Sequence, residues 1–242
     1  MPANMDIVKA EWRARAIAEY RSASVASEFL SWLLRLTFSS DILQASFSVV
    51  GNELDHADMT WEVYQALGAT EEDPLAEITE GALVLPQAFG KPTFERVVLA
   101  CLDVYCIGET LAAALFRAMQ QGVAENAPKQ LLDRLVEDAD QHVQFGWAVI
   151  DECLDRDAKK VASLAKKHLP EYFSRAERAW GLLPDTWIEP VGPHEQRFGL
   201  IARARYKREF YQAIAEQVIP FLEDRNLQGR AAWGRRPKPK KK

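Results

Sequence analysis

Apolar and small residues recur at helical spacing through most of the first 154 residues, and this pattern predicts an all-α protein. Breaks at Ser39-Ser40-Asp41, at Gly68 and at Gly122 separate the periodic stretches, because such residues favour helix caps and stops. The expected helices cover residues 6–38, 39–67, 93–121 and 129–154.

Each of these four helices carries ionisable residues inside its apolar stripe, where side chains are expected to be buried. Burying a charge costs several kcal/mol unless a partner compensates it, so these residues need an explanation. They are Glu19 on the first helix, Glu53 and His56 on the second, Glu109 on the third, and Asp138 and His142 on the fourth.

Glu53 and His56 lie three residues apart, which places a carboxylate and an imidazole on one helix face. Four-helix bundles use such a Glu-x-x-His pair to hold half of a two-metal centre when other helices supply matching carboxylates. One or two divalent cations would neutralise the buried acids. Buried ion pairs with Arg13, Arg15 or Arg134 are the alternative explanation.

This arrangement, together with the segment EDADQHVQFG at 137–146, resembles the ferritin-like di-iron carboxylate superfamily over roughly residues 6–154. That superfamily includes the ribonucleotide reductase small subunit, rubrerythrin and a range of bacterial oxygenases and oxidases. The resemblance implies a four-helix bundle with a long crossover between its second and third helices. It also implies that the metal ligands are Glu19, Glu53, His56, Glu109 and His142, with Glu53 bridging the metals.

The fourth helix departs from the family pattern, because Ala139 stands where a second bridging glutamate is expected. Asp138, one position earlier, is therefore a candidate metal ligand. The same aspartate could instead orient His56 through a hydrogen bond, as carboxylates beside metal ligands do, or it could be a solvated charge. A centre with one metal or two unequal metals, and a degenerate centre, also fit the sequence.

Oxygen-rich ligation with two imidazoles suits iron or manganese better than zinc. The resemblance implies two iron ions, with a Mn/Fe pair or a single iron as alternatives. The implied function is an O2-dependent oxygenase or oxidase acting on a small or medium organic substrate, with Glu53 and Glu109 as catalytic carboxylates. An external electron donor and a homodimer are compatible with it. The alternative class is a non-catalytic metal-binding or partner-binding scaffold.

Tyr105 lies one turn before Glu109 and admits two interpretations. It could be a redox-active phenol near the metals. It could also be a core tyrosine whose hydroxyl bonds a carboxylate.

The remaining segments are expected to extend the same domain. Residues 69–92 contain an acidic run and two prolines, which suits a long connection along the bundle. Two further helices, at 158–178 and 194–222, fall within an extension over 155–228 that packs on the bundle (1–154), and 229–242 is expected to be a disordered basic tail.

Composition narrows the functional class. The chain has 242 residues, 48% of them hydrophobic, and a net charge of −5. Seven basic residues after position 228 leave about −12 on the rest, which argues against nucleic-acid binding. Cys101, Cys106 and Cys153 suggest reduced core thiols. Without a recognisable signal peptide or a membrane-spanning run, a cytoplasmic location is expected.

Overall fold

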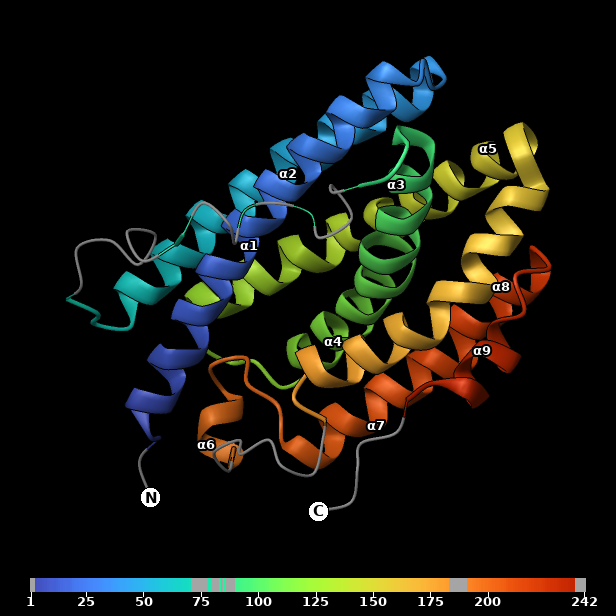
Figure 1. Cartoon of the computed structure of the whole chain (residues 1–242). Coiled ribbons are helices and arrows are strands. Elements are labelled where there is room, and N and C mark those ends of the chain that lie inside the picture. The colour runs from blue at the N-terminus through green and yellow to red at the C-terminus, as the bar shows by residue number, and fades with distance from the viewer. Residues whose placement is uncertain are drawn as a thin grey trace.

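The computed structural model describes residues 3–70, 78–79, 83, 85, 90–182 and 191–237 (Figure 1). Every regular element within these residues is a helix, which confirms the all-α class. Four long helical segments enclose a polar layer, and shorter C-terminal helices pack against two of them.

Helices α1 (Met5–Arg35) and α2 (Ser40–Ala66) lie side by side along most of their lengths (Figure 1). The side chain of Asn4 caps α1 by accepting hydrogen bonds from the N–H groups of Asp6 and Ile7. Gly68, with φ of +80°, follows the end of α2. Both helices therefore match the predicted segments closely, as their stop signals indicated.

The third long segment combines α3 (Thr93–Ala100), η4 (Cys101–Glu109) and α4 (Thr110–Gln120). Its ends match the predicted helix, but its middle is a nine-residue π-helix. A π-helix widens the turn and shifts the side chains that follow, and such distortions occur often at functional sites. Here the distortion ends at Glu109, a candidate ligand.

Helix α5 (Asn126–Ala179) contains both the predicted fourth helix and the predicted helix at 158–178. Asp157, with φ of −158° and ψ of 78°, is non-helical and divides the two parts. The predicted break is thus confirmed as a kink. The α5 segment packs on α2, η4 and α4, and it also meets the C-terminal elements.

The C-terminal region is more broken than the single predicted helix at 194–222. It comprises α6 (Pro193–Gln196), α7 (Arg203–Ala213), η5 (Ile214–Val218), α8 (Ile219–Asp224) and α9 (Gly229–Arg235). These elements pack on the rest of the molecule as expected, with α7 against α4 and α9 against α5 (Figure 1).

Helix α9 corrects the prediction that disorder begins at residue 229. Trp233 packs edge-on against Phe173, with ring centroids 5.2 Å apart, and the Arg236 guanidinium pairs with Glu177 at 2.9 Å. An aromatic anchor and a buried ion pair therefore order a segment that composition alone marked as a solvated tail. Residues 238–242 lie outside the described residues.

The connection predicted at 69–92 lies largely outside the described residues. Two of its positions contact α1: the Ser24 hydroxyl donates to the Leu83 carbonyl at 3.1 Å, and the Leu85 N–H donates to Glu28 at 2.9 Å. Leu85 is fully buried. At these positions the connection therefore runs along α1.

Two separate apolar clusters pack above and below the polar layer. Phe29, Val49, Tyr105 and Phe145 belong to one cluster, whereas Trp12, Val63, Leu115 and Leu135 belong to the other. On each of the four long segments, the candidate site residues fall between these two sets in sequence. The fold therefore carries one internal polar layer, to which all four segments contribute.

The segment Thr93–Gln120 is apolar enough, over an 18-residue window with mean hydropathy 1.7, to pass a length-and-composition test for a membrane span. The sequence expectation that no stretch reaches this level is corrected in that respect. Some 67% of the window is buried inside the protein, as expected for a core helix that is apolar all round.

The three cysteines are free and buried, as expected.

Close contact between α5 and η4 depends on Gly146. A Cβ atom at this position would lie 2.6 Å from Cβ of Tyr105 and 3.1 Å from its carbonyl carbon. We expect Gly146→Ala to lower the free energy of unfolding by about 1–3 kcal/mol through overpacking, measured by urea denaturation. The control is Gly51→Ala on α2, where no atom lies within 4 Å and a gain of about 0.5–1 kcal/mol is expected. Equal effects at the two glycines would contradict this interpretation.

Candidate metal centre

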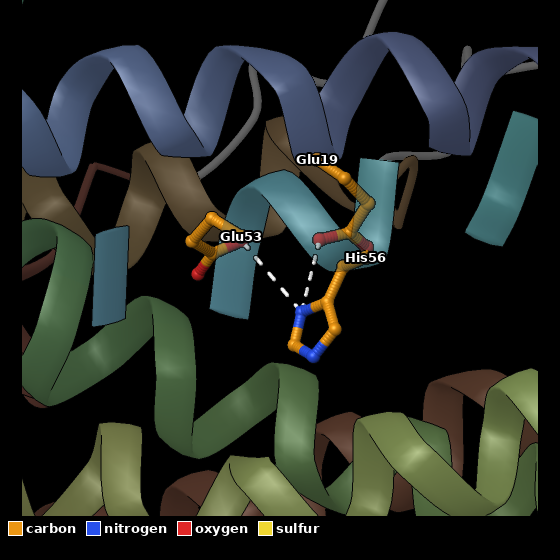
Figure 2. A group of neighbouring side chains, drawn as sticks. All are labelled: Glu19, Glu53 and His56. Carbon is orange, nitrogen blue, oxygen red and sulfur yellow. Dashed lines mark ion pairs between the residues drawn. The ribbon is translucent and has the colours of Figure 1, made fainter. Parts of the chain in front are cut away.

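The first group in the polar layer joins α1 to α2. Figure 2 shows the carboxylates of Glu19 and Glu53 directed at the ring of His56. Nδ1 of His56 lies 3.9 Å from Oε2 of Glu19 and 4.0 Å from Oε2 of Glu53. Each residue can offer one ligand atom, and these atoms all lie within 4.8 Å of one another, so the group could hold a metal ion.

A second group joins α2, η4 and α5. Nδ1 of His142 lies 3.3 Å from Oε1 of Glu53 and 3.6 Å from Oε2 of Glu109. This group meets the same distance condition. The two groups share Glu53, and the rings of His56 and His142 have centroids only 5.9 Å apart. The five predicted ligands therefore form two adjoining groups around one shared carboxylate.

The side chains of this centre are strongly desolvated. Those of Glu53 and His142 are 5% and 3% exposed, and those of Glu19 and Glu109 are 12% and 16% exposed. Burial, followed by repulsion from Glu53, raises the pKa of the Glu19 carboxyl well above its usual value. Without a cation, the centre therefore tends to hold a proton on Glu19.

His142 responds in the opposite sense to its surroundings. Burial lowers the pKa of the imidazole, but hydrogen bonding and attraction from Glu109 and Glu53 outweigh it and raise the pKa to about 10. Protons on His142 and Glu19 thus compensate the carboxylates when no metal does. Metal ions must displace these protons, so metal binding is coupled to proton release.

Asp138 lies outside both groups, on the far side of His56. The imidazole Nε2–H donates to Oδ2 of Asp138 at 2.9 Å, which leaves Nδ1 facing Glu19 and Glu53. Nε of Arg134 also lies 2.9 Å from the same oxygen. Asp138 is buried, which excludes a solvated charge, and this geometry favours orienting His56 over binding metal, because the carboxylate already accepts from two donors.

Asn52 occupies the equivalent place on His142, with its amide nitrogen 3.4 Å from Nε2. Sequence reasoning missed this residue. A usable signal was present, because asparagine is a poor helix former placed next to Glu53 in mid-helix. One imidazole therefore faces a carboxylate and the other a neutral amide, so the two groups are electrostatically unequal.

Asp138→Asn tests the orienting role. Loss of the carboxylate makes His56 a weaker and less fixed ligand, so we expect metal affinity to fall about 10- to 100-fold at one of two sites. Equilibrium dialysis of Mn2+ with wild type and variant measures the change. The control is Asp140→Asn, which alters an exposed carboxylate two residues away and should leave both affinities unchanged. Equal weakening by both variants would contradict the role.

A cavity of about 330 Å³ adjoins both groups. The five predicted ligands line it, and so does Ala139. The position where the family pattern has a carboxylate therefore presents only a methyl group to the cavity. Small and apolar residues form much of the remaining wall, including Gly108, Ala112 and Phe116.

Tyr105 does not line this cavity. Its ring packs against Phe29 and Phe145, with centroids 4.8 and 5.1 Å away. Burial, followed by the charges of Glu109 and Glu53, raises the pKa of its phenol well above the usual value. The structure therefore places Tyr105 in the aromatic core beside the centre, and its phenol stays protonated.

The alternative explanation by arginine ion pairs accounts for only part of the centre. Arg134 pairs with Asp138, and Arg15 pairs with Glu11 at 2.9 Å. The two histidines form ion pairs with Glu19, Glu53 and Glu109. The charge of Arg15 also acts on the Glu19 carboxyl. Three carboxylates thus converge on two imidazoles, a donor set that suits a divalent metal.

Comparison with known proteins adds no family to this description. No family model, curated protein or solved structure matches the chain. Interpretation of the centre therefore depends on its own geometry and chemistry.

Proposed function

We propose that this protein is a ferritin-like non-haem di-iron enzyme, an O2-dependent oxygenase or oxidase acting on a small or medium organic substrate. The observation that carries the proposal is the pair of adjoining carboxylate–imidazole groups that share Glu53. Four helical segments supply the ligands, which is how bundles of this class hold two metals.

Charge balance supports two divalent cations. Glu19, Glu53 and Glu109 contribute three negative charges, and His56 and His142 would be neutral as ligands. Two dications then leave a net charge of about +1, which is a smaller imbalance than three unpaired buried carboxylates. Oxygen ligands with one imidazole per metal suit iron or manganese, and bound iron would supply the redox chemistry that couples O2 reduction to substrate oxidation.

The chain's own residues have separate tasks in this proposal. Glu53 would contribute to both metal sites, Glu19 with His56 would complete one of them, and Glu109 with His142 would complete the other. Asp138 fixes the ring of His56 so that Nδ1 points inward. Two apolar clusters, one on each side of the polar layer, limit the access of bulk water.

Ala139 favours one further candidate, a metal-binding or partner-binding scaffold without turnover. Its methyl group leaves the centre one carboxylate short of the resembled pattern. Metal binding without O2 consumption would support this second function. The cavity beside Ala139 favours the enzyme, since it leaves space for a substrate next to the ligands.

The test is to load the anaerobically purified protein with Fe2+, count iron per chain, and follow absorption and O2 consumption after mixing with air-saturated buffer. We expect about two irons per chain and rapid O2 consumption. Ala139→Glu serves as the matched variant, because it restores the missing carboxylate. Iron binding without O2 consumption in wild type, together with O2 consumption in Ala139→Glu, would favour the scaffold. Absence of iron binding would contradict the enzyme and would leave only a scaffold that binds a partner or another metal.

A further inference from the structure

A second cavity, of about 790 Å³, lies next to the metal-centre cavity. Both cavities are lined by the same five residues: Glu11, Arg15, Met119, Trp180 and Tyr206. These residues stand at the boundary between an outer chamber and the inner chamber that holds the ligands. A molecule that extends across both chambers would lie next to them.

Arg15 is the cationic residue at this boundary, and one of its nitrogens has no partner. It lies four residues before Glu19 on α1, so both side chains share a helix face. Its side chain is only 11% exposed. Nε and Nη2 both donate to Oε1 of Glu11, at 3.0 and 2.9 Å, whereas Nη1 is buried without a hydrogen-bond partner.

A buried donor without an acceptor destabilises the folded state, and more so when the group is charged. The surroundings hold Arg15 in place at that cost. Its guanidinium lies 4.7 Å from the ring centroid of Trp12, and that ring is fixed by a hydrogen bond from Nε1 to the Phe198 carbonyl at 2.9 Å. A fixed cation with a free N–H is preorganised for an acceptor on a ligand.

The acceptor that fits best is a carboxylate. Guanidinium groups bind planar carboxylates with well-defined geometry, and one cation already paired with Glu11 suits a single negative charge better than a double one. Beside the candidate ligands, the inner wall carries the apolar side chains of Val104, Ala112 and Phe116. Its volume of about 330 Å³ is at the small end of ligand cavities.

We propose that Arg15 binds the carboxylate of a small organic acid whose apolar part lies in the inner cavity, facing Glu53 and Glu109. This names a substrate class for the centre, and it rests on the proposed function only for what happens to the acid after it binds. The aromatic rings of Trp180 and Tyr206, with centroids 5.9 Å apart, would flank the molecule at the boundary.

Calorimetric titration of the full-length Mn2+-loaded protein tests the proposal. The probes are benzoate, phenylacetate and hexanoate, each compared with its neutral amide, and inorganic phosphate. We expect at least one acid to bind about tenfold more tightly than its amide. Arg15→Gln should weaken that acid at least tenfold and leave the amide unchanged, and Arg15→Lys should restore part of the affinity. Arg203→Gln alters an arginine of the outer cavity only and should have no effect.

Several results would overturn the proposal. They are acids binding no better than their amides, phosphate binding more tightly than every acid, and acid affinity that Arg15→Gln leaves unchanged. Acid binding that needs Mn2+ and survives Arg15→Gln would place the carboxylate on the metal instead. Loss of metal from Arg15→Gln would assign the residue to the centre itself. Failure of O2 consumption with Arg15-dependent acid binding intact would contradict the proposed function alone.

Discussion

Glu53→Gln is expected to weaken metal binding at both sites by more than about 100-fold. This loss is larger than the loss expected when a residue that only orients a ligand is changed. Glu53 is the carboxylate common to both groups, with one oxygen near His56 and the other near His142. An amide of nearly the same shape keeps the packing but removes the charge that both metals need. Equilibrium dialysis of Mn2+ and iron counting after anaerobic loading measure the loss.

Two other variants test whether the loss of metal binding arises because both sites share Glu53. Glu109→Gln changes a carboxylate of one group only, so one site should survive. Glu62→Gln changes an exposed carboxylate on the same helix as Glu53 and should leave two metals per chain. Thermal unfolding of the metal-free variants separates lost ligation from lost folding. Two tightly bound metals in Glu53→Gln would show that no shared carboxylate organises the centre.

Local sequence patterns predicted most of the helix positions. The spacing of Glu53 and His56 places them on one face of α2 whatever surrounds that helix, and both are buried as predicted. Gly68 and the kink at Asp157 fall at predicted breaks, because capping and stop signals act over a few residues. Periodicity therefore fixed which residues point inward.

Features that depend on contacts between helices were not accessible in the same way. No residue pattern in 101–109 predicts a π-helix. This distortion places Val104, Gly108 and Glu109 together on the cavity wall. Which carboxylate faces which imidazole also depends on how the helices pack. The ligand set could be expected from a family resemblance, but its division into two groups came from the structure.

Arg15 shows most clearly what the sequence could not predict. From sequence it was one of three arginines that could neutralise the buried acids. The structure pairs it with Glu11, four residues before it, leaves Nη1 buried without a hydrogen-bond partner, and places the residue on the wall of two cavities. Cavities form between elements, so one helix's sequence cannot show that a side chain borders one.

The metal-free protein is expected to lose stability as pH rises from 6.5 toward 10. His142 has its pKa raised from 6.5 to about 10 in the folded state, so its contribution is fully present below pH 6.5 and is lost as pH rises through the folded value. The slope for one proton is about 1.4 kcal/mol per pH unit, which gives at most about 5 kcal/mol over the whole window. The raised pKa of Glu19 acts in the same direction.

Urea unfolding of the EDTA-treated chain at pH 6.5, 7.5 and 8.5 measures this loss. The upper limit is chosen because burial also raises the pKa of the Cys101 and Cys153 thiols, which would add a similar slope above about pH 8.5. His142→Gln should flatten the dependence of stability on pH. The control variant His168→Gln replaces a histidine outside the centre and should leave that dependence unchanged. Metal-loaded protein should show the reverse trend relative to metal-free protein, because metal binding displaces protons and strengthens with pH. A metal-free profile that stays flat or rises would mean that His142 does not carry the proton that compensates Glu53 and Glu109.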